Sequence, residues 1–496
     1  TPAPYTASST LQRMELLKTG YMGTLSLGWD NYLFLELTGR QERSSTLKDQ
    51  SFFYPSANLS FLFSNAFRMP AWWNHGKLRL SYGVVGNAPE TYAANIIYEQ
   101  GSDNGFTWNY VPSSWGNANI RPEKKYEYEI GFESKFLNNR LGFDVSYYNN
   151  RVKDQILSTP QPSTSGVKNV LMNVGEVANH GWDISISATP ILTRDFRWDL
   201  TANYGVYKNK VVKLADGVPY LEILNSGGSG IKIQAVEGQP MGDIYAQVPQ
   251  VNENGEYLVS DKGLYLNQTE LQKVGNINPA GVGGLFNSFS YKNVFLDFSI
   301  DFRIGGDVIN EMNQYATAVG LTPESLKYRD TEHGGLSYYY PGDNNSSGIP
   351  VQVDPSTGAG PNGEIIYHDG IILPGVVAST GERNTRIIPA GYYYNTTYNW
   401  GTEAEQLTYR HSVFDNSYVK LRELTIGYQF PEKMISKLGL GRLSVSVFGR
   451  NLFYFYKALK NYDAESSVGT SWANQATVGS STTATRSFGV SLRASF

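Results

Sequence analysis

The sequence has 496 residues and a formal net charge of −4, with 14% aromatic residues and no cysteine. The charge, without any basic cluster, argues against a nucleic-acid partner, and the lack of Cys excludes disulfides and thiolate metal sites and fits an exported protein. No run of about 18 apolar residues occurs, which excludes a transmembrane helix but not a membrane-spanning barrel, whose strands are only half apolar.

Apolar and polar side chains alternate along segment after segment, and helical periodicity is nearly absent. Leu78, Leu80 and Tyr82, for example, are separated by the polar residues Arg79 and Ser81. Such a period of two indicates strands with one apolar and one wet face. The alternation predicts thirteen strands, in chain order near 21–29, 32–42, 52–64, 77–86, 123–136, 140–151, 181–190, 196–208, 281–292, 294–305, 417–430, 441–451 and 486–496.

The connections between these strands alternate in length. The shorter ones lie at 30–31, 65–76, 137–139, 191–195, 293–294 and 431–441. Longer ones lie at 43–51, 87–122, 152–180, 209–280, 306–416 and 452–485. A soluble sandwich would also satisfy the alternation of side chains, but it has no reason to sort its loops by length. The sequence therefore predicts an all-β fold, a transmembrane antiparallel barrel with long loops on its extracellular rim.

The segment SVFDNSYVKLRELTIGYQFPEKMISKLGLGRLSVSVFGRNLFYFYK, residues 412–457, resembles the C-terminal signature of the SusC/RagA family. These proteins are TonB-dependent outer-membrane transporters of the Bacteroidetes. Further segments resemble blocks of the same family and follow its order, at 54–63, 77–87, 117–154, 173–191, 289–308 and, with the sequence YDAES, 462–466.

The resemblance implies a 22-stranded barrel, the size class whose lumen is filled by a plug. It also implies that residues 1–496 are the C-terminal part of the barrel, with an N-terminal extension, TonB box, plug and first strands missing from this chain. The long connections then become extracellular loops at about 87–122, 152–180, 209–280, 306–416 and 452–485. The implied location is the outer membrane of a Bacteroidetes-like Gram-negative bacterium.

The resemblance further implies active import of oligopeptides or glycans, driven by the proton-motive force through TonB and its inner-membrane complex. The expected partners are a SusD-like surface lipoprotein acting as a lid, TonB through the missing N-terminal part, outer-membrane lipid and an oligopeptide or oligosaccharide substrate. A dimer of transporter–lipoprotein pairs is also expected. No enzymatic activity is expected. A passive porin-like channel and a surface β-rich binding or adhesin protein remain alternatives.

Several long loops combine Tyr and Trp with Asn, Ser and Gly. Flat aromatic faces beside amide hydrogen-bonding groups suit sugar rings and extended peptide backbones equally well. The alternative is that these rings belong to the aromatic girdles that all such barrels carry. The candidate substrate contacts are Trp108, Tyr110, Trp115, Tyr338, Tyr339, Tyr393, Trp400 and Trp472.

Signals for other chemistry are weak. No pair among the five His has metal-ligand spacing, so no metal site and no cofactor are expected. Residues 252–256 and 343–345 resemble pieces of surface calcium loops; turn chemistry is the favoured explanation, and surface calcium remains the alternative. Glu127, Glu129 and Glu133 share one wet face of a strand, which a water-filled lumen allows without catalysis.

The final strand, RSFGVSLRASF, runs to the last residue of the sequence. Phe488, Val490, Leu492 and Phe496 are predicted to face lipid, whereas Gly489, Ser491, Arg493 and Ser495 face the lumen. A terminal aromatic residue on such a strand resembles the signal read by the outer-membrane assembly machinery. Phe496 is therefore expected to act in assembly.

Overall fold

The computed structural model describes residues 15–47, 51–95, 98–103, 106–111, 114–226, 230–342, 348–399, 404–406, 408–436, 439–466, 472–479 and 483–495. The chain divides into two compact units. The first comprises Thr1–Leu192, Asp199–Leu221 and Val236–Met241, and the second comprises Thr193–Trp198, Glu222–Ala235 and Gly242–Phe496. Within the described ranges, no helix has the length and apolar character needed to cross a membrane.

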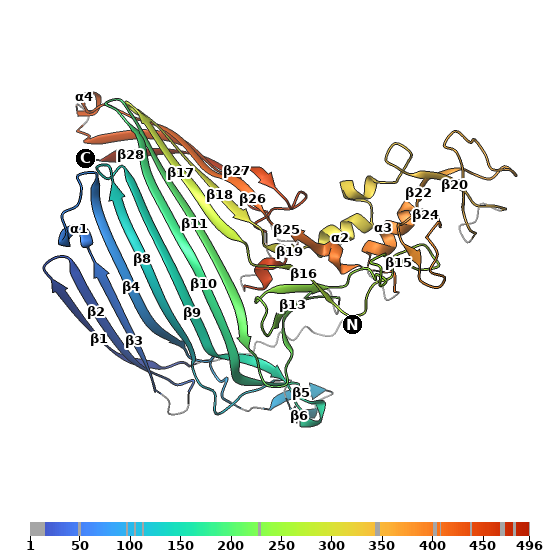
Figure 1. Ribbon diagram of the computed structural model, residues 1–496, viewed down its shortest axis with the longest axis horizontal. Helices are drawn as coiled ribbons and strands as arrows, with labels where there is room; N and C mark the ends of the chain where they lie inside the picture. The colour runs from blue at the N-terminus through green and yellow to red at the C-terminus, as the bar shows by residue number, and fades with distance from the viewer. Residues whose placement is uncertain are drawn as a thin grey trace, which may run out of the picture. The chain divides into compact units, whose positions relative to one another are not determined.

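Long strands dominate the first unit and run side by side in chain order (Figure 1). Pairs from the first of these strands through β10 are antiparallel. The strands are β1 (Lys18–Trp29), β2 (Leu33–Ser44), β3 (Ser51–Phe61), β4 (Trp73–Asn87), β8 (Glu123–Phe136), β9 (Leu141–Pro160), β10 (Asn169–Leu192) and β11 (Phe196–Lys213), whose first three residues belong to the second unit.

Each strand of this sheet has one apolar and one polar face, as the alternation predicts. Leu80 of β4 and its register partner Ile130 of β8 are 40% and 48% exposed on the apolar face. Their neighbours Ser81 and Glu129 pair on the opposite face. An apolar face this exposed in the isolated chain requires an apolar environment to cover it.

The short connections are tight turns with backbone conformations that favour Asn and Asp. Asp30 and Asn31, between β1 and β2, have φ values of 44° and 56°. Two successive residues with positive φ produce the turn twist that matches two antiparallel strands. Leu137, Asn138 and Asn139, between β8 and β9, also have positive φ values, from 57° to 63°. These tight turns confirm the short connections predicted at 30–31 and 137–139.

Smaller elements lie in the connections of the first unit. They are α1 (Phe63–Ala66), the hairpin of β5 (Glu99–Asp103) and β6 (Phe106–Tyr110), the short strand β7 (Ser114–Trp115), which pairs in parallel with β10, and the 3-10 turn η1 (Ser163–Ser165). The hairpin of β5 and β6 is a two-stranded sheet of its own (Figure 1).

The second unit contains a sheet of five long strands, again with neighbours in chain order. Its neighbouring strands pair in antiparallel fashion. The strands are β17 (Gly281–Tyr291), β18 (Val294–Ile304), β26 (Tyr418–Gln429), β27 (Arg442–Lys457) and β28 (Ser487–Ser495), with the short helix α4 (Glu432–Ile435) between β26 and β27.

The connections of the second unit fold into small sheets and helices. The strands are β12 (Tyr220–Ser226), β13 (Ile231–Val236), β14 (Asp243–Ala246), β15 (Leu258–Val259), β16 (Gln272–Asn276), β19 (Asp307–Ile309), β20 (Leu336–Tyr339), β21 (Val351–Gln352), β22 (Tyr367–Ile371), β23 (Val376–Val377), β24 (Ile388–Pro389) and β25 (Val413–Asp415). The helices are α2 (Glu311–Ala318), η2 (Pro323–Leu326), α3 (Ala390–Tyr398), η3 (Tyr409–Ser412) and η5 (Asn474–Ala476).

These connections have hydrophobic cores of their own. One core places Ile231 and Ile233 of β13 against Ile244 of β14 and Ile309 of β19, all of them fully buried. Local signals support the helices around it. Asn310, for example, caps α2 by accepting a hydrogen bond from the backbone N–H of Asn313 at 3.0 Å. The long connections of this unit therefore fold into compact structure with buried cores.

All thirteen predicted strands are confirmed, and their bounds differ mainly at one place. Residues 152–180, expected as a long extracellular loop, are mostly strand, because β9 extends to Pro160 and β10 begins at Asn169. Register shifts at Asn173, Gly175 and Val177 let the two strands remain paired through this stretch. Such bulges interrupt the regular alternation, which is the signal that the sequence prediction follows.

Candidate functional site

Charged side chains on the polar face of the first unit form a network across three strands. Arg79 of β4 donates hydrogen bonds to Asp144 of β9, the shortest of them 2.6 Å, and lies 3.4 Å from Glu133 of β8. The guanidinium crosses β8 above Gly131, where a Cβ atom would lie 2.7 Å from Arg79 Nη2. A side chain at position 131 would therefore require the Arg79 guanidinium to shift.

The three glutamates predicted to share one wet face lie on that face and are all engaged. Glu129 accepts a hydrogen bond from Ser146 Oγ at 2.9 Å, and Glu127 accepts one from Asn150 Nδ2 at 3.1 Å. Glu133 pairs with Arg79, as described above. Carboxylates held by separate partners in this way form a wall of fixed polar groups.

The polar face of the second unit carries similar pairs. Asp297 accepts a hydrogen bond from Ser288 at 2.6 Å, and Arg450 lies 3.3 Å from Glu423. These strands enclose a cavity of about 390 Å³ that is lined by Asp297, Glu423 and Arg493, among others. The placement of Arg493 agrees with the prediction that it points away from the apolar face of β28.

An ion cluster around the buried Lys420 joins the sheet of the second unit to the connection after β27. Glu465, in the YDAES segment, accepts hydrogen bonds from Arg422 at 2.5 and 2.9 Å and from Lys420. Arg422 also donates to Asp301 of β18 at 2.5 Å. Lys420 is only 2% exposed, so Glu465 neutralises a charge that water does not reach.

The neighbouring acid of the same segment is held as firmly. Asp463 accepts hydrogen bonds from Tyr454 Oη at 2.5 Å and from the backbone N–H groups of Glu465 at 3.1 Å and Ala484 at 3.0 Å. The ammonium of Lys420 lies 4.7 Å from the centre of the Tyr454 ring. We call Lys420, Arg422, Tyr454, Asp463 and Glu465 the loop anchor.

The two acids of the loop anchor remain ionised. Burial raises the pKa of Asp463, but the hydrogen bonds from Tyr454 and the backbone outweigh burial and bring the pKa below its usual value. Burial likewise raises the pKa of Glu465, and the stronger effect of Arg422 and Lys420 lowers it below its usual value. The anchor is therefore a set of fixed opposite charges at neutral pH.

The hairpin of β5 and β6 presents an exposed aromatic surface. Phe106, Trp108 and Tyr110 follow one another at every second position and therefore share one face, with 79%, 48% and 44% of their surfaces exposed. Glu99 and Gly101 lie opposite Tyr110 and Trp108 in the register. A hydrogen bond to Glu99 raises the pKa of Tyr110. Rings left uncovered on a short hairpin form a surface suited to binding a partner.

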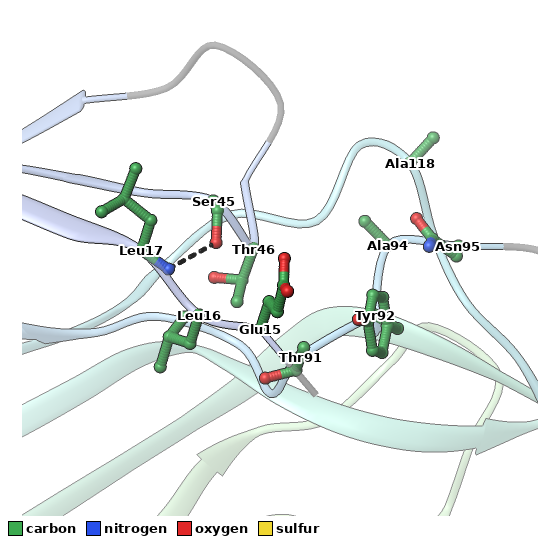
Figure 2. A pocket seen from close by; sticks show the side chains of 10 residues that line it. All are labelled: Glu15, Leu16, Leu17, Ser45, Thr46, Thr91, Tyr92, Ala94, Asn95 and Ala118. Carbon is green, nitrogen blue, oxygen red and sulfur yellow. Dashed lines mark hydrogen bonds between the residues drawn. The ribbon is translucent and has the colours of Figure 1, made fainter. Parts of the chain in front are cut away.

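A cavity of about 790 Å³ lies at the end of the first unit where β1 begins and β2 ends (Figure 2). The segment before β1 contributes Glu15 and Leu16, and the segment after β2 contributes Thr46. A hydrogen bond of 3.0 Å from the backbone N–H of Leu17 to Ser45 Oγ joins these two segments. Figure 2 also shows Thr91, Tyr92, Ala94, Asn95 and Ala118 around the same cavity.

Tyr92 is held at this cavity in a strained backbone conformation. Its φ is 67°, in the left-handed region that a bulky residue rarely adopts, while its side chain is 49% exposed. Backbone hydrogen bonds fix the turn around it, from Asn95 N–H to the Tyr92 carbonyl at 2.9 Å and from Asn117 N–H to the Ala93 carbonyl at 3.1 Å. The turn therefore displays the Tyr92 ring instead of burying it.

We expect Gly116→Ala to displace this turn. A Cβ atom at Gly116 would lie 2.2 Å from the carbonyl oxygen of Asn95 and 2.5 Å from that of Ala93, and backbone atoms cannot move aside as a side chain can. The local structure should lose about 1–3 kcal/mol, measured as faster amide hydrogen exchange in residues 88–122. Gly23→Ala is the control, since nothing lies within 4 Å of its Cβ position. Equal exchange in the two variants would contradict the close packing of Gly116 against this turn.

Residues 2–249 match the family model described as "TonB dependent receptor-like, beta-barrel". The chain belongs to this family. The SusC/RagA resemblance of the sequence is in agreement, and the protein is an outer-membrane β-barrel protein. The polar faces described above thus belong to the lumen side of a TonB-dependent receptor barrel, and the exposed apolar faces belong to its lipid side.

The individual relatives support this placement. The chain is 30% identical over 247 residues to the TonB-dependent receptor SusC of Bacteroides thetaiotaomicron, covering 46% of this chain and 24% of SusC. It is 24% identical over 494 residues to the TonB-dependent receptor P3 of Formosa agariphila, covering 90% of this chain and 42% of that protein. These descriptions are of receptors, in keeping with the expectation that this chain is not an enzyme.

Solved structures show the same fold. The structure titled "Structure of the RagAB peptide transporter" matches with a TM-score of 0.62 at 18% identity, covering 88% of this chain and 44% of that one. This chain thus spans less than half the length of these relatives.

The predicted substrate contacts fall into different environments in this receptor chain. Trp108 and Tyr110 lie on the exposed hairpin face. Tyr339 and Trp115 are half-buried, and the indole N–H of Trp115 has no hydrogen-bond partner within the described residues. Trp400 and Phe496 lie outside the described residues. The substrate and assembly roles of these residues stay predictions.

The other three predicted contacts take part in packing. Tyr338 is 1% exposed, so its ring has no free surface for a ligand in this structure, and burial raises the pKa of its hydroxyl. Tyr393 of α3 packs against the core around Leu264, and burial raises its pKa as well. Trp472 packs against the core around Ile231. We assign Tyr338 to the core of its loop.

The residues that sequence reasoning missed are those of the loop anchor. The sequence marks YDAES only as a family block and indicates no partners for its two acids. The signal that was available is the match of charge between this segment and Lys420 and Arg422 of another family block. Sequence separation of 43 and 45 residues between the partners hid the pairing.

Residues 252–256, which resemble a piece of a calcium loop, form a turn closed by the side chain of Asn252. Asn252 Oδ1 accepts hydrogen bonds from the backbone N–H groups of Asn254 at 3.0 Å and Glu256 at 2.9 Å. In the described ranges of the chain, no group of three or more His, Cys, Asp or Glu side chains is arranged to hold a metal ion. The second segment, 343–345, lies outside these ranges.

We expect the loops of the second unit to lose stability between pH 6.5 and pH 4 because of His411. Burial, reinforced by Arg410, lowers the pKa of His411 from 6.5 to about 4, against an opposing effect of Glu324, and the ring stacks on Tyr398 at 4.5 Å. The unfolded chain therefore takes up the proton first, and the stability present above pH 6.5 falls by roughly 3 kcal/mol as the pH drops to 4.

Hydrogen exchange of residues 390–412 at pH 7 and pH 4.5, corrected for the intrinsic rates, measures this loss. His411→Phe should remove most of the pH dependence. The control is His333→Phe, which changes a half-exposed side chain and should leave the dependence in place. A wild-type segment equally protected at both pH values would contradict the role of His411.

Proposed function

We propose that this chain is part of an outer-membrane importer that takes up oligopeptides or glycans actively, with energy from the proton-motive force delivered through TonB. The observation that carries the proposal is the polar wall of fixed, paired charges in a chain that belongs to the TonB-dependent receptor family. Such a wall offers hydrogen bonds to a polar cargo, while most of its charges are already paired within the wall.

A SusD-like surface lipoprotein is the proposed lid. The exposed aromatic face of the β5–β6 hairpin, Phe106, Trp108 and Tyr110, is the surface that we propose for its docking. Aromatic residues are enriched in protein interfaces because they bury large areas while losing little conformational freedom. The resemblance to SusC and RagA supports a lipoprotein as the partner.

Uptake measurements test the proposal. A strain that makes the complete transporter should accumulate a labelled mixture of oligopeptides and oligosaccharides, and a protonophore should abolish the accumulation. A strain lacking the gene should show neither effect. Uptake that persists when the proton-motive force is collapsed would contradict active import and favour a passive porin.

A further inference from the structure

A further cavity, about 540 Å³ in volume, lies between the end of β27 and the connection that follows it. Its lining includes Lys457 and Arg486, the amide side chain of Asn461, and Lys420, Tyr454 and Asp463 of the loop anchor. The cavity therefore adjoins the anchor and shares the rigid framework that the anchor provides.

Most of the charged groups around this cavity already have partners within the protein. Lys420 is neutralised by Glu465, and Asp463 accepts hydrogen bonds from Tyr454 and from two backbone N–H groups. Asn451, also in the lining, accepts from Arg422 at 3.0 Å and donates to the Thr485 carbonyl at 3.2 Å. These groups shape the cavity, but most of their hydrogen-bonding capacity is already taken up within the protein.

Lys457 and Arg486 are different. The ammonium of Lys457 donates to the carbonyl of Tyr462 at 2.7 Å and lies 5.2 Å from the centre of the Tyr454 ring. Within the described residues, neither Lys457 nor Arg486 forms an ion pair. An ammonium has three donors and a guanidinium five, so both side chains keep donors available for an anion.

We infer that this cavity binds the C-terminal carboxylate of an oligopeptide through Lys457 and Arg486. The inference rests on the proposed import function and names its cargo. One terminal carboxylate meets the two available cations, while the rest of the cargo passes a wall that carries Asp297, Asp301 and Glu423. A polyuronide has a carboxylate on every sugar, which is more negative charge than these two cations can pair.

The test uses the complete transporter purified from outer membranes and a fluorescent heptapeptide of Gly, Ala and Ser, made with a C-terminal carboxylate or a C-terminal amide. Fluorescence anisotropy measures the affinity of each form. We expect the carboxylate form to bind about tenfold more tightly, since charge-assisted hydrogen bonds contribute at this level. Equal binding of the two forms, or no binding of either, overturns the inference.

Variants locate the effect. Lys457→Met with Arg486→Gln should remove the tenfold preference, whereas Lys457→Arg should keep it, because the charge stays at the same place. Lys327→Met, which removes a lysine on the surface of the second unit, is the matched control and should also keep it. A preference that survives in the double variant overturns the assignment of these two residues.

Two further measurements separate the possible failures. Heat-modifiable gel migration, together with the preference retained in Lys457→Arg, shows that the barrel assembles when these positions are changed. Uptake that depends on the proton-motive force, combined with equal binding of acid and amide, overturns the carboxylate site and leaves import standing. Uptake without that dependence overturns the proposed import function instead.

Discussion

Replacing Glu465 with Gln should release the connection after β27 from the sheet of the second unit. The change leaves Lys420, 2% exposed, without its counter-ion and replaces one of the two carboxylate oxygens that accept from Arg422 by an amide nitrogen, which cannot accept. Breaking a buried ion pair from one side costs about 3–5 kcal/mol, because the remaining charge stays buried without compensation. We therefore expect the local opening free energy of residues 458–466 to fall by that amount, measured by hydrogen exchange.

Glu423→Gln is the matched control for this variant. Glu423 lies on the same lumen wall and pairs with Arg450 at 3.3 Å, but the two side chains are 41% and 59% exposed. Exposed pairs contribute about 0–1 kcal/mol, so this change should hardly affect exchange. Lys420→Met added to Glu465→Gln should restore part of the protection, because it removes the unpaired charge. Similar losses in both single variants would contradict a special role for the loop anchor.

The strands of this protein were predictable because each is specified locally. The alternation of Leu78, Leu80 and Tyr82 with polar neighbours fixes both a strand and the face that lipid covers, without knowledge of distant residues. Turns were predictable for the same reason, since Asp30 and Asn31 tolerate the positive φ that a two-residue connection requires. Local chemistry and the final fold agree at these positions.

The candidate site was harder to predict because its contacts are not local. Arg422 joins Asp301, 121 residues earlier, to Glu465, 43 residues later. Nothing in the periodicity of any one segment indicates such a pairing. The sequence placed Glu127, Glu129 and Glu133 correctly on one polar face, but it could not tell which cations they would meet. Composition likewise marks a loop as aromatic without showing whether a given ring is buried or exposed.

The loop anchor also bears on how cargo could be recognised. Tyr454 donates to Asp463 and its ring lies near both Lys420 and Lys457. A shift of the anchored connection would therefore change the cavity that Lys457 and Arg486 line. Because Lys420 is buried against Glu465 and the acids stay charged at neutral pH, the cavity keeps its shape before a ligand arrives. Such preorganisation favours a ligand with one well-defined charged end.

We expect Tyr338→Ala to disrupt the loop that contains β20 and β22, because Tyr338 is a core residue. Its ring stacks on Tyr367 at 5.5 Å, packs edge-on against Tyr340, and its hydroxyl donates to Asp369 at 3.1 Å. Truncation should cost about 3–5 kcal/mol in the hydrogen-exchange protection of residues 336–371, as for other buried aromatic rings.

Two milder variants distinguish packing from cargo binding at this position. Tyr338→Phe keeps the ring and removes one hydrogen bond, so it should cost about 1–3 kcal/mol by leaving the Asp369 carboxylate with one partner fewer. Tyr339→Ala, at the half-buried next position of the strand, should have a smaller effect than Tyr338→Ala. If Tyr338→Phe lost cargo affinity while the loop stayed fully protected, Tyr338 would be a contact with substrate instead of a core residue, and a buried ring would have to become accessible during transport.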